Sequence, residues 1–139
     1  MKKNLTIWVM LALSITGFVD SVYLALKTLF GSPITCSAFS GGCDIVAQSK
    51  YSDFLGVPIS MLGVLFYAAI IIVITYYLQR RTIKSLEWIV YGLLFGGLFS
   101  LYLLALQAFV IEAWCLYCIV ADAIGIANAL LAIRLLRMK

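Results

Sequence analysis

The chain contains no histidine, and only 12% of its 139 residues are charged. The absence of histidine excludes catalytic and metal sites that depend on an imidazole ring. The low charge, together with 65% hydrophobic residues and a mean hydropathy of +1.11, excludes an ordinary soluble domain. The formal net charge of +4 comes from basic residues that flank the apolar stretches, not from a basic patch, and predicts no nucleic-acid site. The sequence therefore predicts a small membrane protein whose most reactive side chains are its four cysteines.

Four apolar stretches are long enough to cross a bilayer, which takes about 20 residues. They cover residues 5–29, 57–78, 86–110 and 115–136, and most are joined by short connections. The expected fold is an all-α integral membrane protein, a four-transmembrane-helix bundle in a single domain of residues 1–139. The one sizeable connection, loop 31–56, is expected to contain a short helix at about residues 44–54 that caps the bundle.

The basic residues predict the orientation of this bundle. Most of them precede the first span, separate the second from the third, or follow the fourth: Lys2, Lys3, Arg80, Arg81, Lys84, Arg134, Arg137 and Lys139. By the positive-inside rule, both termini are cytoplasmic. Loop 31–56 and the start of the last span then face the extracytoplasmic side.

The cysteines form two close pairs on that side. Cys115 and Cys118 make a C-x-x-C motif where the last span begins, and Cys36 and Cys43 lie in the loop. In a helix, Cys115, Cys118 and Asp122 share one face, with Cys118 about 4.5 Å deeper than Cys115. We therefore expect Cys115 to meet the aqueous side, and the positive helix end to favour a thiolate. The loop pair is close enough for a disulfide and too irregular in spacing for a zinc knuckle.

Two acidic residues and two aromatic residues near this motif each allow two interpretations. Asp20 and Asp122 lie at a similar depth in their spans, and either form structural hydrogen bonds or carry protons near a redox site. Trp114 and Tyr117 either anchor the chain at the membrane interface or line an aromatic binding pocket.

The order of these motifs resembles the vitamin K epoxide reductase family. The residues that carry the resemblance are Cys36, Cys43, Asp44, Val46, Ser49, Tyr51, Gly56, Val57, Pro58, Ser60, Gly63 and Tyr67, followed by Cys115 and Cys118 on the last helix. The resemblance is to bacterial and archaeal members, covers nearly the whole chain, and implies a four-helix bundle around a quinone in the cell membrane. It also implies an active-site pair, Cys115 and Cys118, with Cys118 contacting the quinone, and a shuttle pair, Cys36 and Cys43.

The resemblance further implies a quinone site and a partner. Ser49 is expected near the quinone, Asp122 stands where animal members have a tyrosine, and Ile59 or a neighbour stands where they have an asparagine. Because no thioredoxin-like domain is fused here, a separate thioredoxin-fold, DsbA-like protein is the expected thiol donor. It would reduce Cys36–Cys43, Cys43 would attack Cys115, and Cys118 would pass electrons to menaquinone or ubiquinone, so that disulfides are generated.

Three other interpretations remain open. A DsbB-type disulfide oxidase has the same reaction, but carries its C-x-x-C in the first external loop. A small four-helix transporter could use Asp20 as its membrane carboxylate, yet would not need four outward cysteines. A membrane protein with two purely structural disulfides would show no exchange between them.

Overall fold

The computed structural model describes residues 1–31, 50, 53–112 and 114–138. The chain forms helix α1 (Lys2–Leu29), strands β1 (Asp53–Phe54) and β2 (Val57–Pro58), and helices α3 (Ile59–Arg80), α4 (Ile83–Ala105) and α5 (Leu116–Arg137). A π-helical segment, η1 (Leu106–Ile111), continues α4. The four expected spans are confirmed, with ends that differ from the predicted ones by a few residues.

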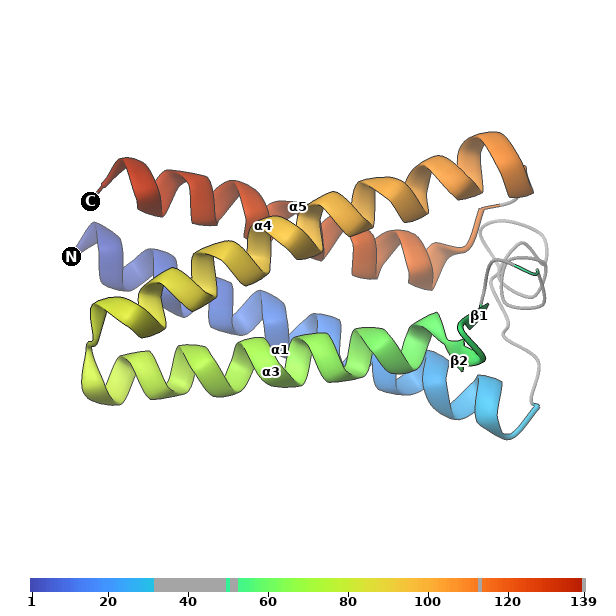
Figure 1. The fold of residues 1–139 in the computed structure, drawn as a ribbon, viewed down its shortest axis with the longest axis horizontal. Helices are drawn as coiled ribbons and strands as arrows, with labels where there is room; N and C mark the ends of the chain where they lie inside the picture. Colours follow the sequence, from blue (N-terminus) through green and yellow to red (C-terminus); the bar gives the residue numbers. More distant parts are fainter. Residues whose placement is uncertain (32–49, 51–52, 113, 139) are drawn as a thin grey trace.

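The helices form an elongated bundle in which each packs against two others (Figure 1). Helix α5 contacts α1 and α4, and α3 contacts the same two helices from the other side. Both termini and the α3–α4 turn lie at one end of the bundle, and the β1–β2 hairpin and the start of α5 lie at the other (Figure 1). The cysteine motif of α5 is therefore at the end opposite the termini.

The apolar side chains divide between a core and an outer surface. Near the end with the termini, the core includes Ile7, Met10, Ile74, Ile89 and Leu135, each at most 1% exposed. Many other large apolar side chains point outward, including Trp8, Leu65, Ile72, Trp88 and Phe95. An outer surface of this kind suits contact with lipid chains and is expected of helices that span a membrane.

Glycines bring the helices close together at the centre of the bundle. A Cβ added at Gly17 of α1 would lie 2.6 Å from Cζ of Tyr67 on α3, and one at Gly96 of α4 would overlap the Phe66 ring. The aromatic rings of α3 therefore occupy space that a larger residue on α1 or α4 would fill.

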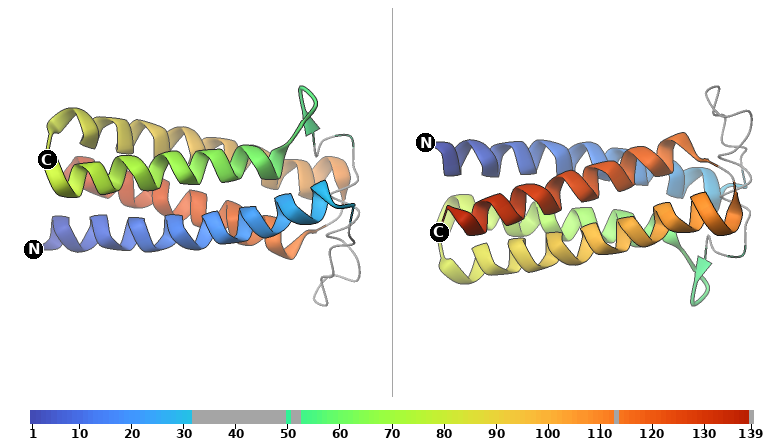
Figure 2. Two further views of the ribbon diagram at one scale, coloured as in Figure 1. Left: turned by 90° about the horizontal axis from the view of Figure 1, so that it is seen from below. Right: turned by 90° about the horizontal axis from the view of Figure 1, so that it is seen from above.

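A tight hairpin leads into α3. Asp53 pairs with Pro58 and Phe54 with Val57, and the turn residues Leu55 and Gly56 have φ of 54° and 82°. Two consecutive positive φ values are typical of a two-residue hairpin turn, which Gly56 adopts without strain. The prediction of a helix through residue 54 is therefore wrong at its end, because the chain reverses here; residues 44–49, 51 and 52 lie outside the described part (Figure 2).

Candidate functional site

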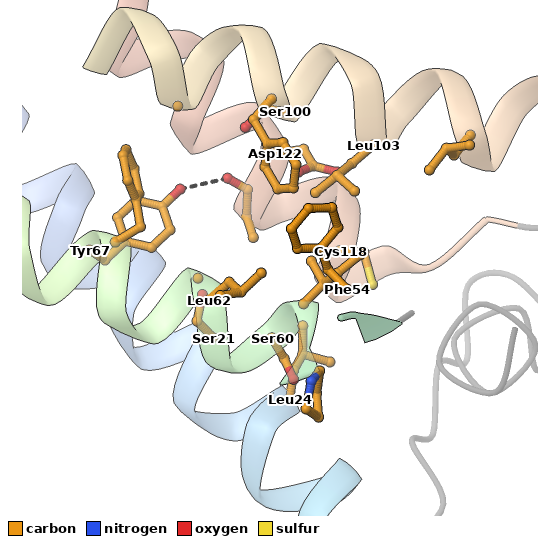
Figure 3. A pocket seen from close by; sticks show the side chains of 18 of the residues that line it. Ser21, Leu24, Phe54, Ser60, Leu62, Tyr67, Ser100, Leu103, Cys118 and Asp122 are labelled. Atoms are coloured by element: carbon orange, nitrogen blue, oxygen red, sulfur yellow. Dashed lines mark hydrogen bonds between the residues drawn. The ribbon is translucent and has the colours of Figure 1, made fainter. Parts of the chain in front are cut away.

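A cavity of about 440 Å³ opens between the helices near the start of α5. All four helices, η1 and the hairpin contribute to its wall. The apolar part of the wall includes Leu24, Leu62, Phe66, Phe95, Phe99 and Leu103, with Phe54 of β1 also contributing (Figure 3). A cavity of this size and character suits an apolar ligand with a ring.

A few polar groups face this apolar space. They are Ser21, Thr28, Ser60, Tyr67, Ser100, Gln107 and Asp122. The Tyr67 hydroxyl donates a hydrogen bond to the backbone oxygen of Ala121 at 2.8 Å, and this bond ties α3 to α5 at the inner part of the cavity (Figure 3). A mostly apolar pocket with few polar groups is the usual form of a site that orients a small molecule.

Cys115 and Cys118 are joined by a disulfide, with their Cα atoms 5.1 Å apart. Cys115 is not part of the helix: it has extended backbone angles and caps α5, and its sulfur accepts a hydrogen bond from the Cys118 N–H at 3.2 Å. Cys118 lies in the first turn of α5 and lines the cavity (Figure 3). One cysteine of the disulfide therefore belongs to the cavity wall.

The expectation that Cys115 meets the aqueous side is wrong, because Cys115 is 0% exposed. Its side chain packs with Leu24 of α1, and Tyr23, Leu116 and Tyr117 cover the same cluster. The extended backbone at the helix start turns the Cys115 side chain toward α1, whereas a helical conformation would have kept it on the face of Cys118.

Gln107 connects the disulfide to Asp122. Its side-chain oxygen accepts a hydrogen bond from the Cys115 N–H at 3.1 Å, and its amide nitrogen donates to Oδ2 of Asp122 at 3.4 Å. Gln107 and Asp122 are both buried and both line the cavity. Gln107 lies in η1, and single π-helical turns are frequent at functional sites.

The structure brings together three of the residues that the sequence singled out. Cys118, Asp122 and Ile59 all line the cavity, whereas Tyr117 is not among its described lining residues. Tyr117 instead packs against Tyr23, with ring centroids 4.9 Å apart. The remaining three predicted site residues, Cys36, Cys43 and Ser49, lie outside the described residues.

Asp20 lies close enough to Asp122 for their charges to interact. Its Oδ2 is buried and has no hydrogen-bond partner in the described part of the chain, so the simple structural hydrogen bond expected for this oxygen is not seen there. Asp20 is not among the described lining residues of the cavity.

Gln107 and Tyr67 were not among the predicted site residues. In the sequence, Gln107 stands out only as a polar residue near a helix end that could contact a ligand, as does Tyr102, which is 54% exposed and does not line the cavity in the described structure. The available signal was an uncharged polar residue in the otherwise apolar run of residues 106–111. Such a residue in a membrane helix usually faces the bundle interior.

Comparison with known families agrees with this site. The family model described as the vitamin K epoxide reductase family matches residues 8–133. The match reaches into all four spans and includes the residues that line the cavity, and members of this family are membrane thiol oxidoreductases linked to quinones. The chain therefore belongs to the vitamin K epoxide reductase family.

Proposed function

We propose that this protein is a quinone-dependent thiol oxidase that generates disulfides in an extracytoplasmic partner. The observation that carries the proposal is the position of Cys118, which shares a disulfide with Cys115 and also lines the apolar cavity. A purely structural disulfide has no need of a ligand-sized cavity beside one of its sulfurs.

The cavity fits a quinone in size and chemistry. Aromatic residues, including Phe95 and Phe99, can hold a flat ring, and the polar groups of Tyr67, Gln107 and Asp122 can hydrogen-bond to its oxygens. A bound quinone supplies an acceptor for two electrons and two protons. Menaquinone and ubiquinone both have a flat ring with two such oxygens.

The relay begins outside the membrane with a thioredoxin-fold, DsbA-like protein whose two thiols are oxidised. Its thiolate attacks the Cys36–Cys43 disulfide, and Cys43 then attacks Cys115, which releases Cys118 as a thiolate. When the Cys115–Cys118 bond forms again, two electrons leave through the Cys118 sulfur, on the cavity side. The chain that carries Cys36 and Cys43 leaves the bundle after α1 and returns at β1, both at the end where α5 starts, which supports this exchange (Figure 1).

The distribution of charge supports an extracytoplasmic site. Both termini and the α3–α4 turn, where the basic residues gather, lie at the end opposite Cys115 and Cys118 (Figure 1). With the basic end in the cytoplasm, the disulfide faces an oxidising compartment in which protein disulfides persist.

The test uses the full chain in a lipid nanodisc, with a short-chain quinone and a reduced thioredoxin-fold protein. We expect the quinone to be reduced as partner thiols disappear, and expect Cys118→Ala and Cys115→Ala to abolish both changes. The control is Ile72→Ala, because Ile72 is 68% exposed on the outside of α3 and should not affect turnover. Full turnover by Cys118→Ala would refute the proposal.

The order of the relay has its own test. Replacing Cys36 alone and replacing Cys43 alone should trap different mixed disulfides, which mass spectrometry can identify. Identical products from the two variants would contradict the proposed order. A transporter would instead tolerate loss of all four cysteines and depend on Asp20.

A further inference from the structure

The orientation of the Gln107 amide is fixed by its neighbours. The backbone N–H of Cys115 can only donate a hydrogen bond, so Oε1 of Gln107 must face it, at 3.1 Å. The amide nitrogen is then left to face Asp122, where it donates to Oδ2 at 3.4 Å. Gln107 is 3% exposed, so both contacts are shielded from bulk water. This side chain therefore holds the start of α5 and the Asp122 carboxyl group in a fixed relation.

Asp122 is the acidic group placed to interact with the inner sulfur. It follows Cys118 by four residues on α5, a spacing that brings side chains together, and both residues line the cavity. Two negative charges on side chains one helical turn apart, in a poorly solvated site, repel each other strongly. A Cys118 thiolate therefore destabilises an ionised Asp122, and the reverse also holds. Protonation of either group removes the repulsion.

Among the described residues, the titratable groups that interact electrostatically with Asp122 are Asp20 of α1 and Tyr67 of α3. The Tyr67 hydroxyl already donates its hydrogen bond to the Ala121 carbonyl oxygen. Asp20 adds a further negative charge when ionised, which also favours a proton on Asp122.

We propose that Asp122 holds the proton beside Cys118 when the disulfide is reduced, and that Gln107 is the positioning residue that keeps the carboxyl group in place. This inference rests on the proposed function and adds how protons accompany the electrons. In the reduced pair, Cys118 is a thiolate, Cys115 is a thiol, and Asp122 carries a proton. When the S–S bond forms, the Cys115 S–H bond breaks and two electrons leave through Cys118. One proton from Cys115 and one from Asp122 go with them to the quinone, which becomes the quinol, and Asp122 is left ionised.

Gln107 has a defined part in this scheme. While the disulfide is intact, its N–H donates to the Asp122 oxygen, and this bond favours the ionised carboxylate against the burial and the Asp20 charge, which favour the protonated form. The carboxylate is then free to take up a proton on reduction. Without this donor, Asp122 would already be protonated in the oxidised protein and could take up none.

The test counts protons in the quinone-free protein. The full chain is equilibrated with thiol–disulfide buffers at several pH values, and the Cys115–Cys118 disulfide is quantified by mass spectrometry after its thiols are trapped. Oxidation of the two buffer thiols itself releases two protons, so the measured equilibrium is independent of pH if the protein takes up two protons, and shifts about tenfold per pH unit if it takes up one. We expect the unmodified chain to take up two protons on reduction, and expect Asp122→Asn and Gln107→Met each to take up one.

Three further variants serve as controls. Gln79 is an exposed glutamine on α3, so Gln79→Met makes the same substitution away from the site and should keep two protons. Asp20→Asn removes the neighbouring carboxylate and should also keep two, and Asp122→Glu should restore the second proton. Circular dichroism of each variant checks that the helices are retained.

Each outcome bears on a separate part of the inference. If the Asp122→Asn protein took up two protons on reduction, Asp122 would not be the proton carrier, because both thiols would then be protonated instead. One proton in Asp122→Asn with two in Gln107→Met would overturn the positioning role of Gln107. Because the measurement needs neither quinone nor partner, it can succeed where the oxidase assay fails, and the two proposals are tested independently.

Discussion

The contact between Gly17 and Tyr67 makes a quantitative prediction about how the bundle is held together. A Cβ at Gly17 would lie 2.6, 2.7 and 2.9 Å from three carbons of the Tyr67 ring, where ordinary contacts are about 3.5–4.0 Å. The ring is 4% exposed and borders the cavity, so it can yield only toward that side. It would have to move by about 1 Å, which would break the 2.8 Å hydrogen bond from its hydroxyl to Ala121.

The change in the free energy of unfolding for Gly17→Ala follows from three terms. Overpacking costs about 1–3 kcal/mol, and loss of the hydrogen bond costs about 1 kcal/mol. Alanine regains about 1 kcal/mol through its greater helix propensity. We therefore expect a net destabilisation of roughly 1–3 kcal/mol.

Gly92→Ala is a matched control for this variant. Its Cβ would meet only Cδ1 of Ile70, at 3.1 Å, and that methyl group is the end of a flexible side chain. The gain in helix propensity is the same, so Gly92→Ala should be nearly neutral. The difference between the two variants therefore isolates the clash with the ring.

The assay is thermal unfolding in detergent, followed by near-ultraviolet circular dichroism. Gly17→Ala should unfold several degrees below Gly92→Ala, on the scale of about 4 °C for each kcal/mol. A second measurement locates the clash: in the background of Tyr67→Leu, adding Gly17→Ala should cost much less, because the ring is absent. Equal unfolding temperatures for Gly17→Ala and Gly92→Ala would refute the packing argument.

Three further predictions concern the cavity and the disulfide. Tyr67→Phe should lower the free energy of unfolding by about 1 kcal/mol, because the Ala121 carbonyl loses its donor; an unchanged unfolding temperature would contradict this. Leu103→Trp should raise the KM for quinone by roughly tenfold by filling the cavity, while the protein unfolds as before; an unchanged KM would place the quinone elsewhere. Tyr117→Ala should speed reduction of the Cys115–Cys118 disulfide by dithiothreitol, because Tyr117 helps to cover Cys115; a raised quinone KM instead would assign Tyr117 to the binding site.

The membrane spans could be predicted because hydropathy alone defines them. Each of the four helices is a long apolar run, and the basic residues mark the same end of the bundle in sequence and in structure. The ends of the helices were harder to predict from the sequence. A helix at residue 54 was expected from apolar spacing, yet the positive φ values of Leu55 and Gly56 reverse the chain instead. Turn geometry of this kind depends on two residues and is easily missed in an apolar pattern.

The candidate site was predicted only in part, because it depends on how the helices pack against one another. The face shared by Cys118 and Asp122 follows from helical spacing, and both residues line the cavity. The partners of Gln107 do not follow from spacing: they require the π-helical turn of η1 and the cap at Cys115 to come together. A buried amide can be recognised in a sequence as unusual, but its hydrogen bonds are set by tertiary packing.

The two sulfurs of the disulfide have different surroundings, and this difference bears on the proposed direction of electron flow. Cys118 faces the cavity, whereas Cys115 is covered by Tyr23, Leu24 and Tyr117. In the oxidised state described here, the disulfide is therefore open toward the proposed quinone site and closed toward an incoming thiol. Attack at Cys115 requires the Tyr23 and Tyr117 side chains to separate from their 4.9 Å ring contact. In the proposed relay, Cys43 can reach Cys115 only when that cover moves, so separation of the two tyrosines must precede the second exchange, in which Cys43 attacks Cys115.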